Sequence, residues 1–222
     1  MPSRVVASLS YKKEYINHLA TQVSFFYSGS SQGRFSYIYS ADFNRDGQTN
    51  DLIYVPKNAS DASEINFVNL TVGGKTYTPA DQAALLSQYI DQDPYLRTRR
   101  GQYAERNGAK LPWRNQVDFR FAQDIFVTAG KRNTLQFTLD IVNLGNLINR
   151  NWGISQIVNN ASLLTPVNYT TLVAGGTVKP TFTLATFNNA PVTNTVRNQL
   201  TTGTTTGGST YQMQIGVRYL FN

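Results

Sequence analysis

Apolar and polar residues alternate along five stretches of the chain, the pattern of a strand with one apolar and one polar face. In the last stretch, residues 211–221, the odd positions are aromatic or aliphatic, whereas Gln212, Gln214 and Arg218 lie between them. The other apolar rows fall within residues 5–11, 19–27, 117–125 and 135–141. With its flanking residues each stretch covers about nine to twelve positions, the length that a tilted strand needs to cross a bilayer.

Two structures produce such alternation. A soluble antiparallel sandwich also has alternating strands, but its strands usually run about five or six residues. Here the stretches are longer, the apolar rows often end in aromatic residues, and the polar rows carry charges at mid-strand, at Asp118, Arg120 and Asp140. The pattern favours the wall of an antiparallel transmembrane β-barrel, with lipid on one face and a watery lumen on the other.

The connections between the five stretches alternate in length. Short links, "KKEYINH" and "TAGKRN", join the first stretch to the second and the third to the fourth. Long connections, about 28–112 and 145–209, join the others. Short periplasmic turns and long extracellular loops alternate in this way in outer-membrane barrels, which would place the last residue on the periplasmic side.

The long connections contain elements of their own. "RFSYIYS" and "NDLIYVP" predict short strands that form a hairpin continuing the wall. "TPADQAALLSQYIDQ" predicts a helix with Thr78 as N-cap and Pro79 at its first position; "DPYLRTR" predicts a second, short helix. Within residues 152–187, "WGISQIV" and "PTFTLATF" predict either two more crossing strands or, as we prefer, an extracellular hairpin.

Composition narrows the alternatives. The formal charge of +7 comes from scattered residues, and no RNA- or DNA-binding signature accompanies it, so we expect no nucleic-acid partner. Because the chain has no cysteine, it has no disulfide scaffold, thiol nucleophile or thiolate metal site. His18 is the only histidine, so a Ser-His-Asp triad would have to use this residue. His18 lies in a predicted turn, where we expect a surface residue. We therefore do not expect an enzyme.

Five strands, or seven with the optional pair, cannot close a barrel, because about eight is the smallest number that does. We therefore expect the chain to be the C-terminal portion, residues 1–222, of a larger all-β barrel.

Three motifs carry a family resemblance. "DFNRDGQTNDLIYVP", "FTLDIVNLGNLIN" followed by "NWG", and the terminal "YQMQIGVRYLFN" occur in this order. Together they resemble the last part of TonB-dependent outer-membrane receptors of the Oar-like kind.

The resemblance implies an integral outer-membrane protein with a 22-stranded barrel, an N-terminal plug that this chain does not contain, and energy supplied through TonB. It also implies uptake of an unknown ligand, selected by the extracellular loops. In that family a terminal aromatic is read by the barrel-assembly machinery; here Tyr219 and the penultimate Phe221 would serve. The alternative is a smaller outer-membrane or surface-exposed β-protein with a structural or adhesive role.

One loop could bind a metal. Asp42, Asn44, Asp46 and Gly47 have the spacing D-x-N-x-D-G of the first half of an EF-hand calcium loop. The twelfth position is Ile53 rather than Glu, so Asp51 or another loop would have to complete the site. The alternative is a turn rich in Asp and Asn that joins two strands.

A basic cluster follows the predicted helix, with Glu105 as its only acidic residue; it consists of Arg97, Arg99, Arg100, Arg106, Lys110 and Arg114. It could attract an anionic ligand or lipopolysaccharide phosphates. The alternative, which we favour, is that the arginines pair with lumen carboxylates such as Asp118 and Asp124 or are simply solvated.

Overall fold

The protein was examined as a computed structural model, which describes residues 3–126, 133–168, 180–199 and 209–221. The chain forms two compact units. The strand unit comprises Met1–Gln32, Pro112–Gln156 and Asn198–Asn222. The loop unit comprises Gly33–Leu111 and Ile157–Arg197. Most of the described regular structure is β-strand, with few helices, so the predicted all-β class is confirmed.

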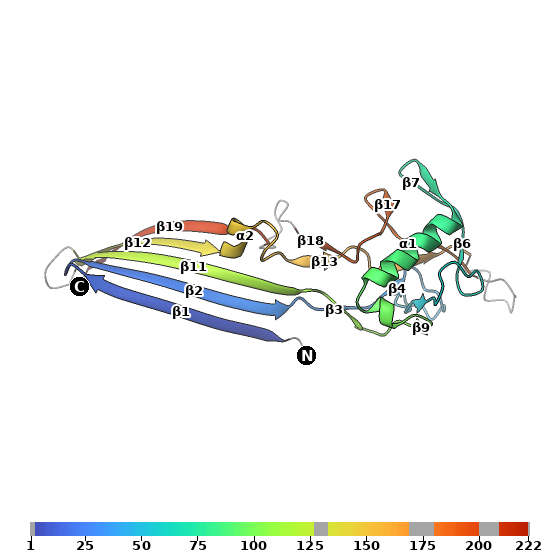
Figure 1. The fold of residues 1–222 in the computed structure, drawn as a ribbon, viewed down its shortest axis with the longest axis horizontal. Helices are drawn as coiled ribbons and strands as arrows, with labels where there is room; N and C mark the ends of the chain where they lie inside the picture. The colour runs from blue at the N-terminus through green and yellow to red at the C-terminus, as the bar shows by residue number, and fades with distance from the viewer. Residues whose placement is uncertain (1–2, 127–132, 169–179, 200–208, 222) are drawn as a thin grey trace. The chain divides into compact units, whose positions relative to one another are not determined.

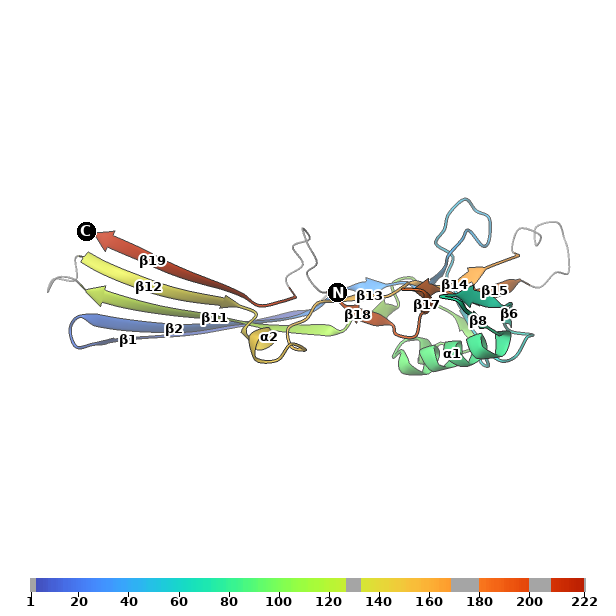
Figure 2. The ribbon, with the colours of Figure 1, turned by 90° about the horizontal axis from the view of Figure 1, so that it is seen from above.

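The strand unit is built on one antiparallel sheet of five long strands (Figure 1). In spatial order they are β1 (Arg4–Tyr15), β2 (Leu19–Ser31), β11 (Trp113–Phe126), β12 (Asn133–Val142) and β19 (Gln212–Phe221). They lie in the same order when seen from above (Figure 2). All five predicted strands are therefore confirmed. Long strands that follow one another along the chain also lie side by side in the sheet. The described strands close no barrel.

The register brings the predicted apolar rows together on one face of the sheet. One cross-strand row consists of Leu9, Phe25, Phe119, Ile141 and Met213. The next consists of Tyr11, Val23, Phe121, Leu139 and Ile215. Since a slip of one residue would turn a strand's whole apolar set to the other face, this shared row structure fixes the register of all five strands.

The first short link is shorter than predicted. Strand β1 continues to Tyr15, so only three residues, Ile16 to His18, separate it from β2. Ile16 and Asn17 adopt positive φ angles of 53° and 52°, which lets the chain reverse in so few residues but is unusual for β-branched Ile16. The second short link, "TAGKRN", lies almost wholly outside the described residues. The sequence did not predict the five-residue helix α2 (Leu144–Ile148), which begins one residue after Asn143 and follows β12.

The loop unit contains short strands drawn from both long connections. Its largest sheet has the order β4 (Ile38–Tyr39), β14 (Ser162–Pro166), β15 (Thr181–Leu184) and β6 (Asn66–Phe67). The β14–β15 pair is antiparallel, whereas β4–β14 and β6–β15, which join the two connections, are parallel. The remaining short strands of this unit are β3 (Arg34–Phe35), β5 (Tyr54–Val55), β7 (Leu70–Val72), β8 (Lys75–Tyr77), β9 (Gln102–Tyr103), β10 (Ala109–Lys110), β16 (Thr186–Phe187) and β17 (Ala190–Pro191). Strands β13 (Gln156–Val158) and β18 (Val196–Asn198) each have one residue, Gln156 and Asn198, that belongs to the strand unit.

Helix α1 (Pro79–Gln92) confirms the helix prediction, including its cap. The Thr78 hydroxyl accepts from the Asp81 backbone N–H, and the Asp81 carboxylate accepts from the Thr78 N–H, which together form a capping box. These bonds hold the pKa of the Asp81 carboxyl below its usual value. Leu86, Tyr89 and Ile90 are buried, and the helix packs against β6 and β15 (Figure 2). The predicted second helix is the 3-10 turn η1 (Leu96–Thr98).

A buried carboxylate links these helices. Asp93 caps the end of α1 and accepts backbone N–H bonds from Tyr95 and Leu96, both at 2.8 Å, at the start of η1. Its other oxygen accepts from the Tyr37 hydroxyl at 2.6 Å and from the Thr195 hydroxyl at 3.0 Å. Burial next to this carboxylate raises the pKa of Tyr37. A fully hydrogen-bonded buried charge of this kind fixes how its surrounding segments pack.

The hydrophobic core of the described chain lies in the loop unit. It includes Tyr37, Ile53, Leu86, Ile90, Leu96 and Leu164, all nearly inaccessible to solvent. No described residue of the strand unit belongs to this core. The long connections are therefore a folded body with its own interior rather than extended loops.

Two predictions about the connections need correction. "RFSYIYS" and "NDLIYVP" do meet, through an antiparallel bridge between Ile38 and Leu52, but they join the loop unit and not the five-stranded wall. "WGISQIV" and "PTFTLATF" do not pair with each other: β13 pairs with β18, and β15 pairs with β14. No described residue from 152 to 187 adds a strand to the five-stranded sheet. Sequence pattern missed β14, whose residues do not alternate.

None of the helices in the described part of the chain is both long and apolar enough to cross a membrane.

Candidate functional site

The two faces of the five-stranded sheet differ in chemistry. We call the face with the rows of Leu9 and Tyr11 the apolar face and the opposite one the polar face. On the apolar face large side chains remain exposed, among them Leu9 at 69%, Ile215 at 78% and Phe221 at 79%. The described part of the strand unit holds no second sheet, and its only helix is the short α2. Its apolar face is therefore left open.

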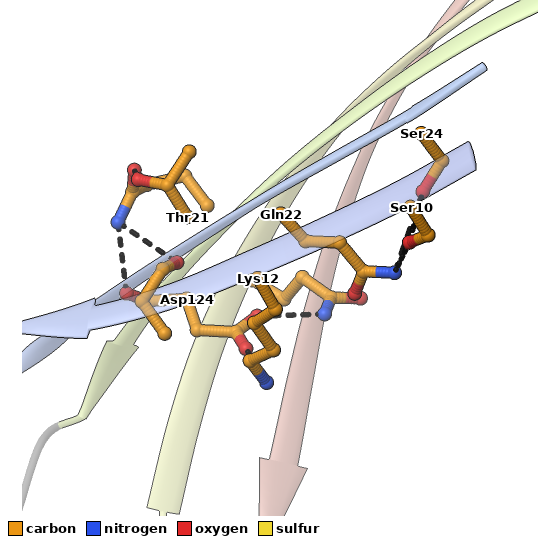
Figure 3. Close-up of polar contacts among 9 residues, drawn as sticks. Ser10, Lys12, Thr21, Gln22, Ser24 and Asp124 are labelled. Atoms are coloured by element: carbon orange, nitrogen blue, oxygen red, sulfur yellow. Dashed lines mark hydrogen bonds and ion pairs between the residues drawn. The ribbon is translucent and has the colours of Figure 1, made fainter.

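The polar face carries ion pairs and hydrogen bonds between strands, some of them adjacent in the sheet and one reaching across β2. Lys12 on β1 pairs with Asp124 on β11 at 3.1 Å, and Asp124 also accepts from the Gln136 amide at 2.7 Å. Arg120 and Asp140 approach to 3.5 Å. Figure 3 shows the contacts among Ser10, Gln22 and Ser24, where the two hydroxyl oxygens lie 2.8 Å apart. These side chains offer donors and acceptors to water or to a polar solute.

The apolar face has one polar row. Lys13, Thr21 and Gln123 are cross-strand neighbours there, one row from the end that carries the three-residue turn. The Thr21 hydroxyl donates to Gln123 Oε1 at 2.6 Å, and the Tyr15 hydroxyl lies 2.8 Å from that of Thr21. Figure 3 shows Thr21 on the other side of the strands from Ser10 and Gln22. The cluster satisfies its own hydrogen bonds at the margin of the apolar surface.

The predicted calcium residues lie together in one loop. Asp42 accepts backbone N–H bonds from Asp46 and Gly47 at 3.1 and 2.9 Å, and Asp51 accepts from Phe43 and Asn44 at 2.6 and 3.0 Å. Gly47 has a φ of +91°, as the sharp turn of such a loop requires.

The carboxylates of this loop therefore hold its own backbone. Among the residues that the structure describes, no three His, Cys, Asp or Glu side chains form a group able to hold a metal ion. Calcium binding by Asp42, Asn44, Asp46 and Asp51 stays a prediction of the sequence.

The basic cluster divides into two kinds of arginine. Arg99 pairs with Glu105 at 3.1 Å, and Arg100 pairs with Asp91 at 2.8 Å while also donating to the Lys57 carbonyl at 3.0 Å. Their partners are thus local, and neither is Asp118 or Asp124 as expected. Arg97 and Arg106 are exposed, and their side chains make no hydrogen bond or ion pair with another described residue. Of these four arginines, only Arg97 and Arg106 have charge available for an anionic ligand.

The motif residues that follow β12 bind one another. Asn143, nearly inaccessible and in a left-handed conformation (φ 58°), donates from its side chain to the carbonyls of Gly153 and Ser209 at 3.0 and 3.1 Å. Asn146 donates to the Trp152 carbonyl at 3.0 Å and accepts from the Tyr211 N–H at 3.2 Å. Two asparagines thus tie "VNLGN", "NWG" and the entry into β19 together.

The two C-terminal aromatics lie at the end of β19. Tyr219 is opposite Leu135 and Phe221 is opposite Asn133 on β12, and the two rings are 6.2 Å apart. Both are exposed on the apolar face. This position is compatible with an assembly signal, which stays a prediction.

No protein-family model matches the chain, and neither a curated protein nor a solved structure matches it significantly. The function of this chain must therefore be inferred from its own geometry. The residues that sequence analysis missed are those around Trp113 and Trp152, which lie far apart in the sequence and close together beside β11. The signal available was that these are the only two tryptophans.

Proposed function

We propose that the strand unit is part of the wall of a large outer-membrane β-barrel, the C-terminal part of a TonB-dependent receptor of the Oar-like kind. The observation that carries this proposal is the open apolar face. A sheet whose aliphatic and aromatic rows lie exposed requires an apolar environment, and exposed apolar patches of this extent mark a contact with lipid or protein. Hydrocarbon suits all of these aliphatic and aromatic rows at once, and the polar row of Lys13, Thr21 and Gln123 lies at their margin, near the three-residue turn.

Strand length and tilt agree with a bilayer. The five strands have 10 to 14 residues, and at a rise of about 3.4 Å per residue they span roughly 34 to 48 Å along their axes. When tilted by about 40°, such strands cover roughly 26 to 36 Å along the membrane normal, enough for an apolar band of about 25 Å. Strands of a soluble sandwich have no need of this length.

The two outer strands support a larger assembly. Strands β1 and β19 each have a neighbour on one side only among the described residues. Long edge strands without a partner are an aggregation hazard, and closure of a barrel removes both edges. In the proposed 22-stranded barrel, β1 would pair with the strand before it and β19 with the first strand of the barrel.

The polar face would then line the lumen. Its ion pairs, Lys12 with Asp124 and Arg120 with Asp140, are compatible with a wet interior in which a plug and a transported solute are accommodated. The loop unit would lie on the extracellular side and select the ligand, with Arg97 and Arg106 available for anionic groups. Energy would come from TonB through an N-terminal plug, and Tyr219 and Phe221 would be read by the barrel-assembly machinery.

Single-cysteine labelling tests the membrane assignment. The chain contains no cysteine, so Ile215→Cys and Gln214→Cys each give one labelling site on opposite faces of β19. After reconstitution of the full chain into liposomes, we expect a fluorophore at residue 215 to be quenched by nitroxide-bearing lipids and protected from iodide. The label at residue 214 should respond in the opposite way. Efficient iodide quenching at residue 215 would overturn the proposal.

One observation favours the second candidate, a smaller surface-exposed β-protein with an adhesive role. The loop unit has its own core, so it could act as a displayed binding domain without transport. The genomic DNA upstream of the reading frame distinguishes the two candidates. Coding sequence for a plug and further strands supports the receptor, and an unrelated gene followed by a stop codon supports the smaller protein.

A further inference from the structure

A cavity of about 600 Å³ lies beside the start of β11, and residues of the strand unit alone form it. Both tryptophans of the chain line it, Trp113 from β11 and Trp152 from the segment after α2. The polar side chains in its lining are Arg114, Asn115, Asn151, Gln156 and Asn198. This volume is within the range of small-ligand sites.

The tryptophans present apolar rings to this space. The indole N–H of Trp113 donates to Asn115 Oδ1 at 3.0 Å, so the polar atom of this ring is occupied. A Cβ at Gly29 would lie only 2.9 Å from Nε1 of the Trp113 ring, and the absence of one there lets the indole lie close to β2. Trp152 is 55% exposed, and the bonds of Gly153 to Asn143 and Arg114 hold its segment beside β11. Both rings therefore retain apolar surface for a ligand.

Apart from Arg114, the polar side chains of the cavity are neutral amides, and their existing hydrogen bonds show which donors and acceptors remain for a ligand. Asn115 Oδ1 already accepts from Tyr27 at 2.7 Å and from Trp113, so Asn115 offers a ligand its N–H groups. Gln156 donates to Asn198 Oδ1 at 3.1 Å, which leaves the Gln156 carbonyl as an acceptor and the Asn198 amide as a donor. The Asn151 side chain hydrogen-bonds to no other described residue.

Charge restricts the ligand further. Arg114 is the only ionisable residue in the lining, and its Nε already donates to the Gly153 carbonyl at 3.0 Å. The described lining holds no carboxylate, so an amine would find no counter-ion there. A highly charged phosphate ligand would find a single cation.

We infer that this cavity binds a saccharide. A sugar ring has an apolar C–H face, which suits the face of an indole, and a rim of hydroxyls, each both donor and acceptor, which suits alternating amide N–H and C=O groups. The inference depends on the cavity alone and holds whether or not the strand unit crosses a membrane.

Because both tryptophans of the chain line the cavity, tryptophan fluorescence, excited apart from that of the 13 tyrosines, reports on this site. The full chain in detergent micelles is titrated with four soluble tetrasaccharides: α-linked glucose, β-linked glucose, β-linked xylose and α-linked galacturonate. We expect at least one to shift the emission to shorter wavelength and reduce quenching by acrylamide. Trp113→Phe and Trp152→Phe, each with one remaining tryptophan, should both respond to the same sugar.

Two further variants separate binding from folding. Asn151→Ala removes an amide that supports no described contact, and we expect it to weaken the active tetrasaccharide about tenfold, as loss of one good hydrogen bond would. Gln88→Ala, an exposed amide on α1, should leave the affinity unchanged. Equal affinity in the Asn151→Ala and Gln88→Ala proteins would overturn the assignment.

The competing role is that of interfacial anchors, because tryptophan and tyrosine also gather where a membrane meets water. In liposomes containing brominated lipid, anchors would be quenched while none of the four sugars changes the emission. That result overturns the saccharide inference and leaves the membrane proposal standing. If instead a sugar changes the emission while iodide quenches the label at residue 215, the saccharide inference stands and the membrane proposal is overturned.

Discussion

Asn143 shows how much one residue can fix. It adopts a left-handed backbone, its N–H donates to Asp118 Oδ1 at 2.8 Å, and its side chain holds Gly153 and Ser209. Gly153 is part of the same arrangement, since a Cβ there would lie 1.9 Å from Asn143 Oδ1. The residue types of the "VNLGN…NWG" motif thus have a physical explanation that does not depend on any family resemblance.

Gly153→Ala should destabilise the protein, whereas Gly145→Ala should not. Gly153 has a φ of +65° and no room for a methyl group, so we expect a loss of about 1–3 kcal/mol in the free energy of unfolding. At Gly145, within α2, a Cβ would meet Trp152 Cβ at an ordinary 3.6 Å. Urea unfolding of both variants in the same detergent gives the comparison. Equal stabilities would mean that the Asn143–Gly153 contact is not a constraint.

Calcium binding is the second prediction at the scale of residues. If the loop of Asp42, Asn44, Asp46 and Asp51 binds the ion, isothermal titration of the full chain with Ca²⁺ gives a binding isotherm that Asp46→Ala abolishes. The physical reason is that a hard cation needs several carboxylate oxygens at once. Asp61→Ala, which removes a carboxylate of another turn in the loop unit, is the matched control. Identical heats from wild type and Asp46→Ala would remove the prediction.

Among the elements, β4 joins the two long connections through an aromatic cluster. The Tyr39 ring lies 4.6 Å from that of Phe43 and 5.6 Å from that of Phe182, a residue of β15. Its hydroxyl accepts from the Tyr54 N–H at 3.2 Å. Burial raises the pKa of Tyr39 to about 12. The neutral phenol is therefore required for this packing.

Because this packing requires the neutral Tyr39 phenol, the free energy of unfolding should fall in alkaline solution. A tyrosine with a pKa near 10 when unfolded and about 12 when folded stabilises the protein fully below pH 10 and progressively less as the pH rises to 12. Tyr37, whose pKa burial also raises, acts in the same direction. We expect a decline of about 1.4 kcal/mol per pH unit for each such group across this window. Urea midpoints at pH 9, 10.5 and 11.5 measure it.

Tyr39→Phe is the control, because the variant should lose its share of the pH dependence and keep that of Tyr37. A stability that stays constant from pH 9 to 11.5 in the wild-type protein would contradict the raised pKa values.

For the whole molecule, the contrast between the units is the main feature. The loop unit buries its apolar residues in its own interior, while the strand unit leaves its apolar rows exposed. Such a division suits a chain that meets two different solvents. The proposed membrane supplies for the strand unit what a hydrophobic core supplies for the loop unit.

Charge substitutions on β19 test this division. Ile215→Arg places a cation on the apolar face, and in a bilayer we expect it to lower folding stability by about 2–4 kcal/mol. Gln214→Arg, one residue away on the polar face, should cost less than about 1 kcal/mol. Refolding yields in liposomes across a urea series give both values. If the two variants behave alike, the apolar face does not contact hydrocarbon.

Local signals in the sequence were sufficient for the regular elements. Alternation identified all five long strands, since side chains on a strand point to opposite faces in turn. The Thr78-Pro79-Asp81 cap identified the start of α1, because each of its bonds joins residues close in sequence. The same locality explains the Asp42–Asp46 turn. Short strands such as β6 and β14 carry too few residues for a period to be recognised.

The sequence by itself determined which residues can form strands, which face of each is apolar, and that the chain cannot rely on disulfides. Only the tertiary structure decided that the two long connections form one folded unit through the parallel β4–β14 and β6–β15 pairs. It alone also paired Arg99 and Arg100 with Glu105 and Asp91, and placed Trp113 and Trp152 in the lining of one cavity. The physical reason is that such contacts join residues far apart in the chain or depend on backbone turns, whose partners no local periodicity specifies.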